Sequence, residues 1–63
     1  MKKHAENLKA NDLFMHEELG AWKAMQDAVK AAENTIKVLC WNTRSMKTKQ
    51  FEFGRFVSLD IID

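Results

Sequence analysis

The sequence contains no proline, and its 63 residues include only two glycines, Gly20 and Gly54. These residue types mark turns and linkers, so their scarcity leaves no candidate linker, and we predict a single domain over residues 1–63. A domain of this length buries only about 60% of the surface that its unfolded chain exposes. We therefore expect a marginal stability that a partner or a second copy of the chain would raise.

Cysteine and histidine are also scarce. The one cysteine, Cys40, excludes an intrachain disulfide, and the two histidines, His4 and His16, form no zinc-binding spacing with it. His16 precedes two glutamates, but neighbours in sequence diverge on a helix, so a solvent-facing turn is the better interpretation. Cys40 is interpreted as a small buried side chain of a strand. No metal and no cofactor are predicted.

Long apolar runs are absent as well. The longest, at residues 38–41, is far shorter than the roughly 20 residues that a membrane span needs. The basic start Met1-Lys2-Lys3 is followed by charged and amide residues where the apolar part of a secretory signal would lie. We therefore predict an intracellular, cytoplasmic protein, and a lone free cysteine fits a reducing compartment.

The formal net charge of +1 conceals an uneven distribution of charge along the chain. Residues 12–33 carry five acidic side chains and two lysines, whereas residues 35–55 carry five basic side chains and one glutamate. The two segments can pack against each other, or either can bind a partner of opposite charge.

Residues 12–33 have apolar side chains at helical spacing, and we predict one long amphipathic helix there. At about 100° per residue, one face collects the apolar side chains Phe14, Met15, Leu19, Trp22, Met25, Val29 and Ala32. Asn11 is the expected N-cap, and Gly20 costs about 1 kcal/mol relative to alanine without ending the helix. A short helix over residues 3–10 either precedes the long helix or extends it.

From Thr35 onward β-branched and aromatic residues predominate, and their alternation predicts a first strand over residues 35–42. Residues 51–63 carry large apolar side chains at every second position and are predicted to form a second strand. The polar stretch 42–49 between them suits the turn of an antiparallel hairpin. The expected fold class is α+β, with the long N-terminal helix packed on a C-terminal antiparallel β-hairpin.

A coiled coil is the second interpretation of the same residues. Met15, Trp22, Val29 and Ile36 are seven positions apart, as the core positions of a heptad repeat are. The helix would then continue through Leu39 or beyond as a coiled-coil arm. We favour the strand, because the residues after Thr35 are typical of β-structure.

The alternation of the last strand assigns its side chains to two faces. The core-facing set is Phe51, Phe53, Val57, Leu59 and Ile61. Phe56 and Ile62 fall on the opposite face, where with Trp41 or Leu39 they would form an exposed apolar patch. The expected rim of this patch is Lys37, Lys49 and Asp60. Exposed apolar patches with polar rims mark protein interfaces.

Two charged residues fall on apolar faces: Glu18 in the predicted helical stripe, and Arg55 in the final strand. Glu18 either points outward from the edge of the stripe or pairs with a lysine or arginine of the hairpin, and Arg55 is the first candidate for such a salt bridge. A lone carboxylate without a second acid, a nucleophile or a metal ligand is not an active site. No catalytic residue is therefore predicted.

These observations predict a small non-enzymatic protein-binding regulator or inhibitor that forms a homodimer or binds a larger target protein. Phages and mobile elements encode small proteins of this kind to block a host protein. The expected partner-binding residues are Trp41, Arg44, Lys47, Lys49, Arg55, Phe56 and Ile62. The final strand is also an expected sheet edge, which can pair with a second copy or with a partner's strand.

Nucleic-acid binding by residues 44–56 is the alternative function. Basic side chains there lead into a run of phenylalanines, as in proteins that stack bases on aromatic residues and hold phosphates with lysine and arginine. The run resembles the aromatic strand motif of RNA-recognition domains and the Phe-Gly-x-Phe turn of histone-like DNA-binding proteins. The glycines flank different aromatic residues and neither fold fits this chain, so we assign it to no family.

Overall fold

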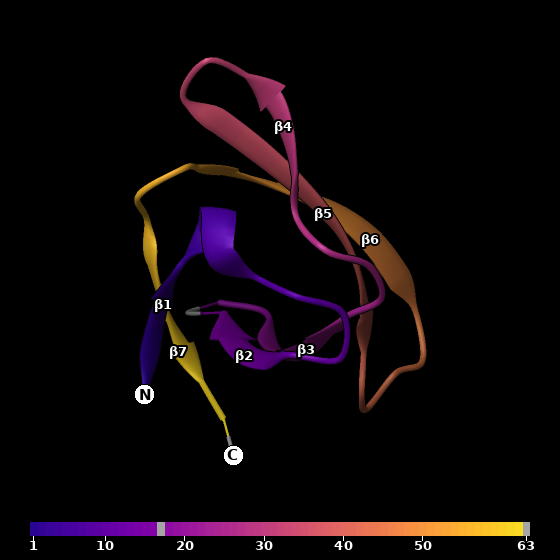
Figure 1. Cartoon of the computed structure of the whole chain (residues 1–63). Coiled ribbons are helices and arrows are strands. Elements are labelled where there is room, and N and C mark those ends of the chain that lie inside the picture. Colours follow the sequence, from indigo (N-terminus) through magenta and orange to yellow (C-terminus); the bar gives the residue numbers. More distant parts are fainter. Residues whose placement is uncertain (17, 63) are drawn as a thin grey trace.

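The computed structural model describes residues 1–16 and 18–62; Glu17 and Asp63 lie outside the described residues. The described chain forms a curled antiparallel sheet, a half-barrel around one core (Figure 1). Its elements are β1 (Lys2–His4), the 3-10 turn η1 (Ala5–Asn7), β2 (Leu13–His16), β3 (Gly20–Ala24), β4 (Val29–Ala32), β5 (Thr35–Asn42), β6 (Thr48–Gly54) and β7 (Ser58–Ile61).

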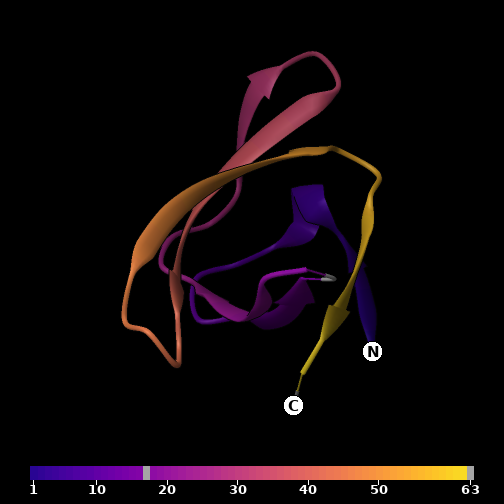
Figure 2. The same cartoon turned by 180° about the vertical axis from the view of Figure 1, so that it is seen from behind.

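Strand β5 lies at the centre of the sheet. One of its edges pairs with β3 at the Asn42 end and with β4 at the Thr35 end, and its other edge pairs with β6. A turn at residues 55–57 separates β6 from β7, which pairs with β1 and β2. This bend is the orange-to-yellow arc in Figures 1 and 2. It returns the chain to β2 and so curls the sheet.

The predicted α+β fold is wrong, because the described residues between 12 and 33 form β2, β3 and β4 instead of a long amphipathic helix. The chain reverses direction near Asn11, with φ of 76°, and Gly20, with φ of 85°. A helix excludes these backbone angles, whereas glycine and asparagine adopt them readily. Glu17, which the predicted helix would include, lies outside the described residues.

The apolar side chains of the predicted helical stripe divide between the two faces of the sheet. Phe14 and Trp22 are buried, whereas Met15 is 46% and Val29 50% exposed. The coiled-coil interpretation fails for the same reason, since its four heptad positions lie in four different strands. Within residues 3–10 the helical structure is limited to the three residues of η1, and part of the segment belongs to β1.

The predicted strand over residues 35–42 is confirmed as β5, and its antiparallel hairpin with β6 is present. The single strand predicted over residues 51–63 is wrong in extent, because β6 begins at Thr48 and the turn interrupts it. The turn interrupts the alternation, which resumes in the same phase with Leu59 and Ile61 buried. Val57, expected in the core, lies in the turn and is 43% exposed. The predicted end of that strand at Asp63 lies outside the described residues.

The core fills the inside of the curled sheet. Its buried apolar side chains are Ala5, Leu8, Phe14, Trp22, Ala24, Ile36, Val38, Cys40, Phe51, Leu59 and Ile61, with Ala28 and Phe53 packed against them. Phe51 joins the aromatic side chains, since its ring centroid lies 4.9 Å from Trp22 and 6.0 Å from Phe14 in edge-on contacts. Such contacts add to the apolar area that the aromatic rings bury.

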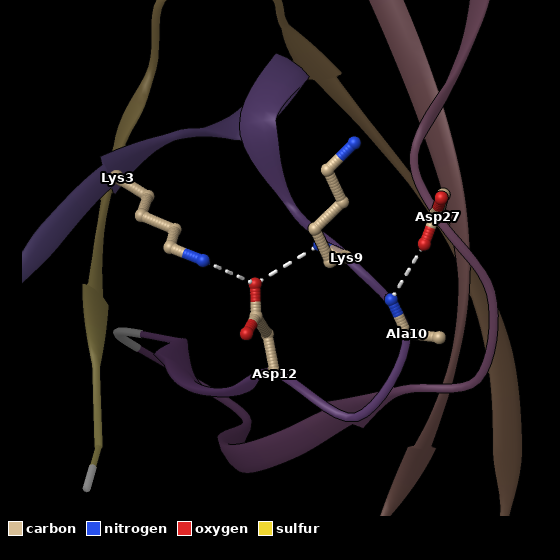
Figure 3. Close-up of polar contacts among 5 residues, drawn as sticks. All are labelled: Lys3, Lys9, Ala10, Asp12 and Asp27. Atoms are coloured by element: carbon tan, nitrogen blue, oxygen red, sulfur yellow. Dashed lines mark hydrogen bonds and ion pairs between the residues drawn. The ribbon is translucent and has the colours of Figure 1, made fainter.

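Two carboxylates hold the loop between η1 and β2 (Figure 3). Asp12 Oδ2 accepts hydrogen bonds from the Lys9 backbone N–H and from Lys3 Nζ, each at 2.9 Å. The Ala10 N–H donates to Asp27 Oδ1, also at 2.9 Å. Partial burial raises the pKa of Asp12, but the hydrogen bonds from Lys9 and Lys3 and the lysine charges lower it, and the net pKa lies below its usual value.

No helix among the described residues has the length and apolar character that crossing a membrane requires.

Candidate functional site

Trp41 lies in a row of side chains that crosses the sheet. Leu13 of β2 pairs with Lys23 of β3, Lys23 pairs with Trp41 of β5, and Trp41 pairs with Thr48 of β6. Directly paired residues of antiparallel strands point to the same face. Because Leu13 alternates with the buried Phe14, this row lies on the outer face, opposite the core.

Apolar residues surround this row. Ile62 follows the buried Ile61, and its N–H donates to Leu13 O at 2.8 Å, so it extends the row beyond β2. Met25 lies beside Leu39, since the Met25 N–H donates to Leu39 O at 2.8 Å. We call the resulting surface the outer patch: Leu13, Met15, Met25, Leu39, Trp41 and Ile62. All six side chains are half-buried or exposed.

Basic side chains lie inside and beside the outer patch. Lys23 stands between Leu13 and Trp41 in the row described above. At the other side of β5, Lys37 pairs with Glu52 of β6, which places opposite charges together. The Trp41 end of the patch, with Lys23 and the basic turn that follows β5, is therefore positively charged.

The turn between β5 and β6 is built around Asn42. Its side-chain Oδ1 accepts the backbone N–H groups of Arg44 and Ser45, each at 2.9 Å, as asparagine does in tight turns. Met46, at φ of 63°, donates its N–H to Asn42 O at 2.9 Å. The turn presents Arg44 and Lys47 in exposed positions. Two of the predicted partner-binding residues thus lie beside Trp41.

Lys49 lies on the other face of β6. It alternates with Thr48, and its Nζ is 5.3 Å from the centroid of the Phe51 ring. The His16 ring is 5.3 Å from the same phenylalanine, and its Nδ1 accepts the backbone N–H groups of Glu18 and Leu19 at 3.2 Å. His16 therefore closes the β2–β3 turn, while Lys49 stands on an exposed part of the sheet edge away from the outer patch.

Arg55 and Phe56 lie on the β6–β7 turn, apart from the outer patch. The guanidinium carbon of Arg55 is 4.7 Å from the centroid of the Phe56 ring, and the His4 ring meets the same ring edge-on at 5.6 Å. Phe56 is 60% exposed, as predicted, and its ring contacts are with His4 and Arg55. The predicted set of partner-binding residues is thus divided among three places.

Arg55, the first candidate partner for Glu18, does not pair with it. Arg55 instead pairs with Glu6, with 3.1 Å between Nη2 and Oε1. Glu18 is exposed in the β2–β3 turn. The error follows from the absent helix, because Glu18 was placed on the apolar face of an element that the chain does not form.

The residue types of a catalytic triad line a hollow of about 300 Å³ that contains Ser58, His16 and Asp60. A triad needs the acid to bind the histidine nitrogen that does not face the nucleophile. Here His16 Nδ1 accepts backbone N–H groups, and Asp60 pairs with Lys2 at 3.5 Å. The hydrogen bonds made by these described side chains are therefore not those of a triad.

The described residues offer neither a cluster of metal ligands nor an exposed thiol. Among residues 1–16 and 18–62, no group of three histidine, cysteine, aspartate or glutamate side chains could hold a metal ion. Cys40 is fully buried, and this burial raises the pKa of its thiol to about 11. A thiol of this kind packs as a small apolar side chain.

Sequence reasoning missed four members of the site: Leu13, Met15, Lys23 and Met25. All four were assigned to the predicted helix or its cap region. No sequence alternation marked this strand, because Leu13, Phe14 and Met15 are all apolar, and only the structure shows which of them is buried. The helical spacing of the longer segment was the stronger local signal.

Comparisons with family models, with curated proteins and with solved structures found no match for the chain. The function proposed below rests on the geometry of this chain alone.

Proposed function

We propose that the protein is a small non-enzymatic regulator or inhibitor that binds a partner protein through the outer patch, in the cytoplasm. The observation that carries the proposal is the composition of the outer face. An antiparallel sheet with one solvated face normally places polar residues there. In this sheet the outward positions of β2 include Leu13 and Met15, and those of β5 include Leu39 and Trp41.

The chemistry of the patch suits protein binding. Tryptophan and arginine are the residue types that most often dominate the energy of protein interfaces. Trp41 is half-buried and pairs with Lys23, and Arg44 lies in the turn that follows β5. A complementary partner would offer an apolar hollow for Trp41 with acidic side chains around it.

The biological role is a further part of the proposal. A chain of this size that presents one apolar face suits an inhibitor that covers a surface of its target. Phages and mobile elements encode such inhibitors against host proteins, and this suggestion of origin rests on the size of the chain. Homodimer formation through the same patch is the other form that protein binding could take.

The test compares two aspartate variants. We expect Trp41→Asp to abolish binding, whereas Met46→Asp should bind normally, because Met46 is exposed in the β5–β6 turn outside the outer patch. Each of the three proteins is immobilised on an affinity column, and mass spectrometry quantifies the cell proteins that each column retains. We expect wild type and Met46→Asp to retain a partner that Trp41→Asp does not. Equal retention by all three proteins would exclude the outer patch as the binding surface.

Nucleic-acid binding is the second candidate function. Its support is the β5–β6 turn, where residues 43–49 include Arg44, Lys47 and Lys49 and no acidic residue. Phe51 and Phe53 face the core, however, which leaves Phe56 as the exposed ring of the run. An affinity for single-stranded or duplex oligonucleotides that falls steeply with salt, and falls again in Lys47→Ala, would favour this function.

A further inference from the structure

We propose that β6 binds an acidic, extended segment of a partner protein as an added antiparallel strand. The proposal rests on the proposed function in that the occupant belongs to a protein. It concerns a different surface, since the added strand would lie along the sheet edge instead of over the outer patch.

The direction of the backbone groups of β6 follows from its ladder with β5. At one end Asn42 donates its N–H to Lys47 O at 2.7 Å, and at the other Arg55 donates its N–H to Asn34 O at 2.9 Å. Hydrogen-bonded pairs alternate along an antiparallel ladder. In the register between β5 and β6, the hydrogen-bonded residues of β6 are therefore Lys49, Phe51 and Phe53.

The remaining residues of β6 direct their backbone groups to the other edge. These residues are Thr48, Gln50 and Glu52, and their side chains are exposed. In the described part of the chain, no other strand pairs with that edge. An incoming strand would therefore find a row of N–H and C=O groups with the spacing that strand addition requires.

Strand β6 differs from the other strands at the margins of the sheet. β1 has three residues and β4 has four with an irregular register, whereas β6 has seven in a continuous register. Short or irregular edge strands are protected against added strands. Length and regularity make β6 the suitable template.

Charge selects the occupant. One end of this edge is basic, with Arg44, Lys47 and Lys49. The only acidic side chain of β6, Glu52, lies toward its other end. A lysine on an edge strand opposes pairing with a second copy, because it must be desolvated opposite an uncharged or like-charged neighbour. A strand that offers a carboxylate opposite Lys49 removes this cost, so the charge pattern favours an acidic partner.

The register specifies a probe. In an antiparallel added strand, residues opposite Phe51 and Phe53 would be apolar, and residues opposite Lys47 and Lys49 would be acidic. The peptide Val-Thr-Val-Thr-Glu-Thr-Glu, blocked at both ends, meets these requirements in the order from Phe53 to Lys47. The matched control peptide has lysine in place of both glutamates.

The experiment titrates 15N-labelled protein with millimolar peptide and follows the backbone amides by NMR. We expect the amides of Thr48, Gln50 and Glu52 to shift and to exchange more slowly with solvent. The lysine peptide should bind at least about fivefold more weakly, which corresponds to about 1 kcal/mol for two edge ion pairs. No shift of these amides with the acidic peptide would overturn the proposal.

Two substitutions at one position isolate the edge hydrogen bonds. Gln50→Pro removes the N–H that points to the free edge and leaves the ladder with β5 intact, and proline is tolerated on edge strands. Gln50→Ala retains the N–H. We expect the proline variant to bind the peptide at least about fivefold more weakly than the alanine variant, as the loss of one hydrogen bond predicts. Equal binding by the two variants would contradict strand addition.

Other occupants give distinct results. A protein that is dimeric without peptide, and becomes monomeric in Gln50→Pro by light scattering, would assign the edge to a second copy and overturn the proposal. An oligothymidine that shifts the same amides and displaces the peptide would overturn it as well. Trp41→Asp should bind the peptide normally, so the failure of the outer patch and the failure of the edge are distinguishable.

Discussion

Glu6 Oε1 accepts hydrogen bonds from both Nε and Nη2 of Arg55, at 3.3 and 3.1 Å. The two residues are 49 positions apart and join η1 to the turn between β6 and β7. Backbone bonds run beside them, since the Glu6 N–H donates to Arg55 O at 3.1 Å and the Ala5 N–H to Val57 O at 2.8 Å. The ion pair therefore supports the bend that returns the last strand to β2.

The first prediction concerns this ion pair. In a double-mutant cycle, Glu6→Ala and Arg55→Ala should show a coupling of about 0.5–1 kcal/mol in the free energy of unfolding, as partly exposed ion pairs do. Urea titration followed by tryptophan fluorescence measures it. Glu18→Ala with Arg55→Ala is the control cycle and should be additive. Coupling in the control and additivity in the Glu6 cycle would contradict the observed pairing.

A second prediction concerns acid stability. The folded state holds the pKa of Asp12 below its usual value of 3.8. The unfolded chain therefore takes up the proton first, so the stabilisation is present above about pH 4 and is lost as the pH falls through the lower folded pKa. Asp12→Asn should lower stability by about 1 kcal/mol at pH 7, since the hydrogen bonds from Lys9 and Lys3 weaken.

Thermal unfolding at pH 7, 5, 4, 3 and 2 checks this expectation. The difference between wild type and Asp12→Asn should be constant between pH 7 and 5 and should shrink below pH 4. Lys3→Ala is the matched control, because it keeps the backbone hydrogen bond from Lys9 and should lose less stability than Asp12→Asn. A difference that grows as the pH falls would contradict the assignment.

Part of the fold could be predicted from the sequence because the local and tertiary signals agree there. In β5, Ile36, Val38 and Cys40 stand at every second position among β-branched and aromatic residues, and all three are buried as this spacing predicts. Residues 13–32 carry the opposite local signal, since alanine, lysine, glutamate and methionine all favour helices. Burial of Phe14 and Trp22 inside the sheet overrides that preference, and a single sequence does not show tertiary contacts of this kind.

The candidate site was predictable to a similar extent. Trp41 and Ile62 were placed on a face opposite the core, and they lie in one row of the outer face. Phe56 was placed on the same face, and it is exposed in the turn at residues 55–57, with its ring against His4 and Arg55. The turn depends on backbone bonds such as Arg55 N–H to Asn34 O, which no local residue pattern indicates.

A third prediction concerns the thiol of Cys40. Its side chain is buried and burial raises its pKa to about 11, so at pH 8 only about one thiol in a thousand is ionised. We expect the folded protein to resist alkylation by iodoacetamide, and labelling to follow global unfolding as urea is added. Mass spectrometry measures the labelled fraction. Rapid labelling without urea would contradict a buried Cys40, and a small-molecule thiol in the same solution serves as the control.

The last prediction separates the two faces of β2. Phe14 is fully buried against Phe51 and Phe53, whereas the next residue, Met15, lies on the outer face. Truncating a buried phenylalanine to alanine costs about 3–5 kcal/mol. A core of this size rarely supplies more than about 3–5 kcal/mol of stability. Phe14→Ala should therefore be unfolded at 25 °C, and Phe14→Leu should fold with a loss of about 1 kcal/mol.

Met15→Ala is the matched control. A helical stripe would bury both Phe14 and Met15, whereas a strand buries only Phe14. We expect Met15→Ala to change stability by less than about 0.5 kcal/mol, as exposed substitutions do. Circular dichroism during heating gives the midpoints of Phe14→Leu and Met15→Ala, and it shows whether Phe14→Ala is folded at 25 °C. Comparable losses in Phe14→Ala and Met15→Ala would show that the two side chains share one buried face, which the strand excludes.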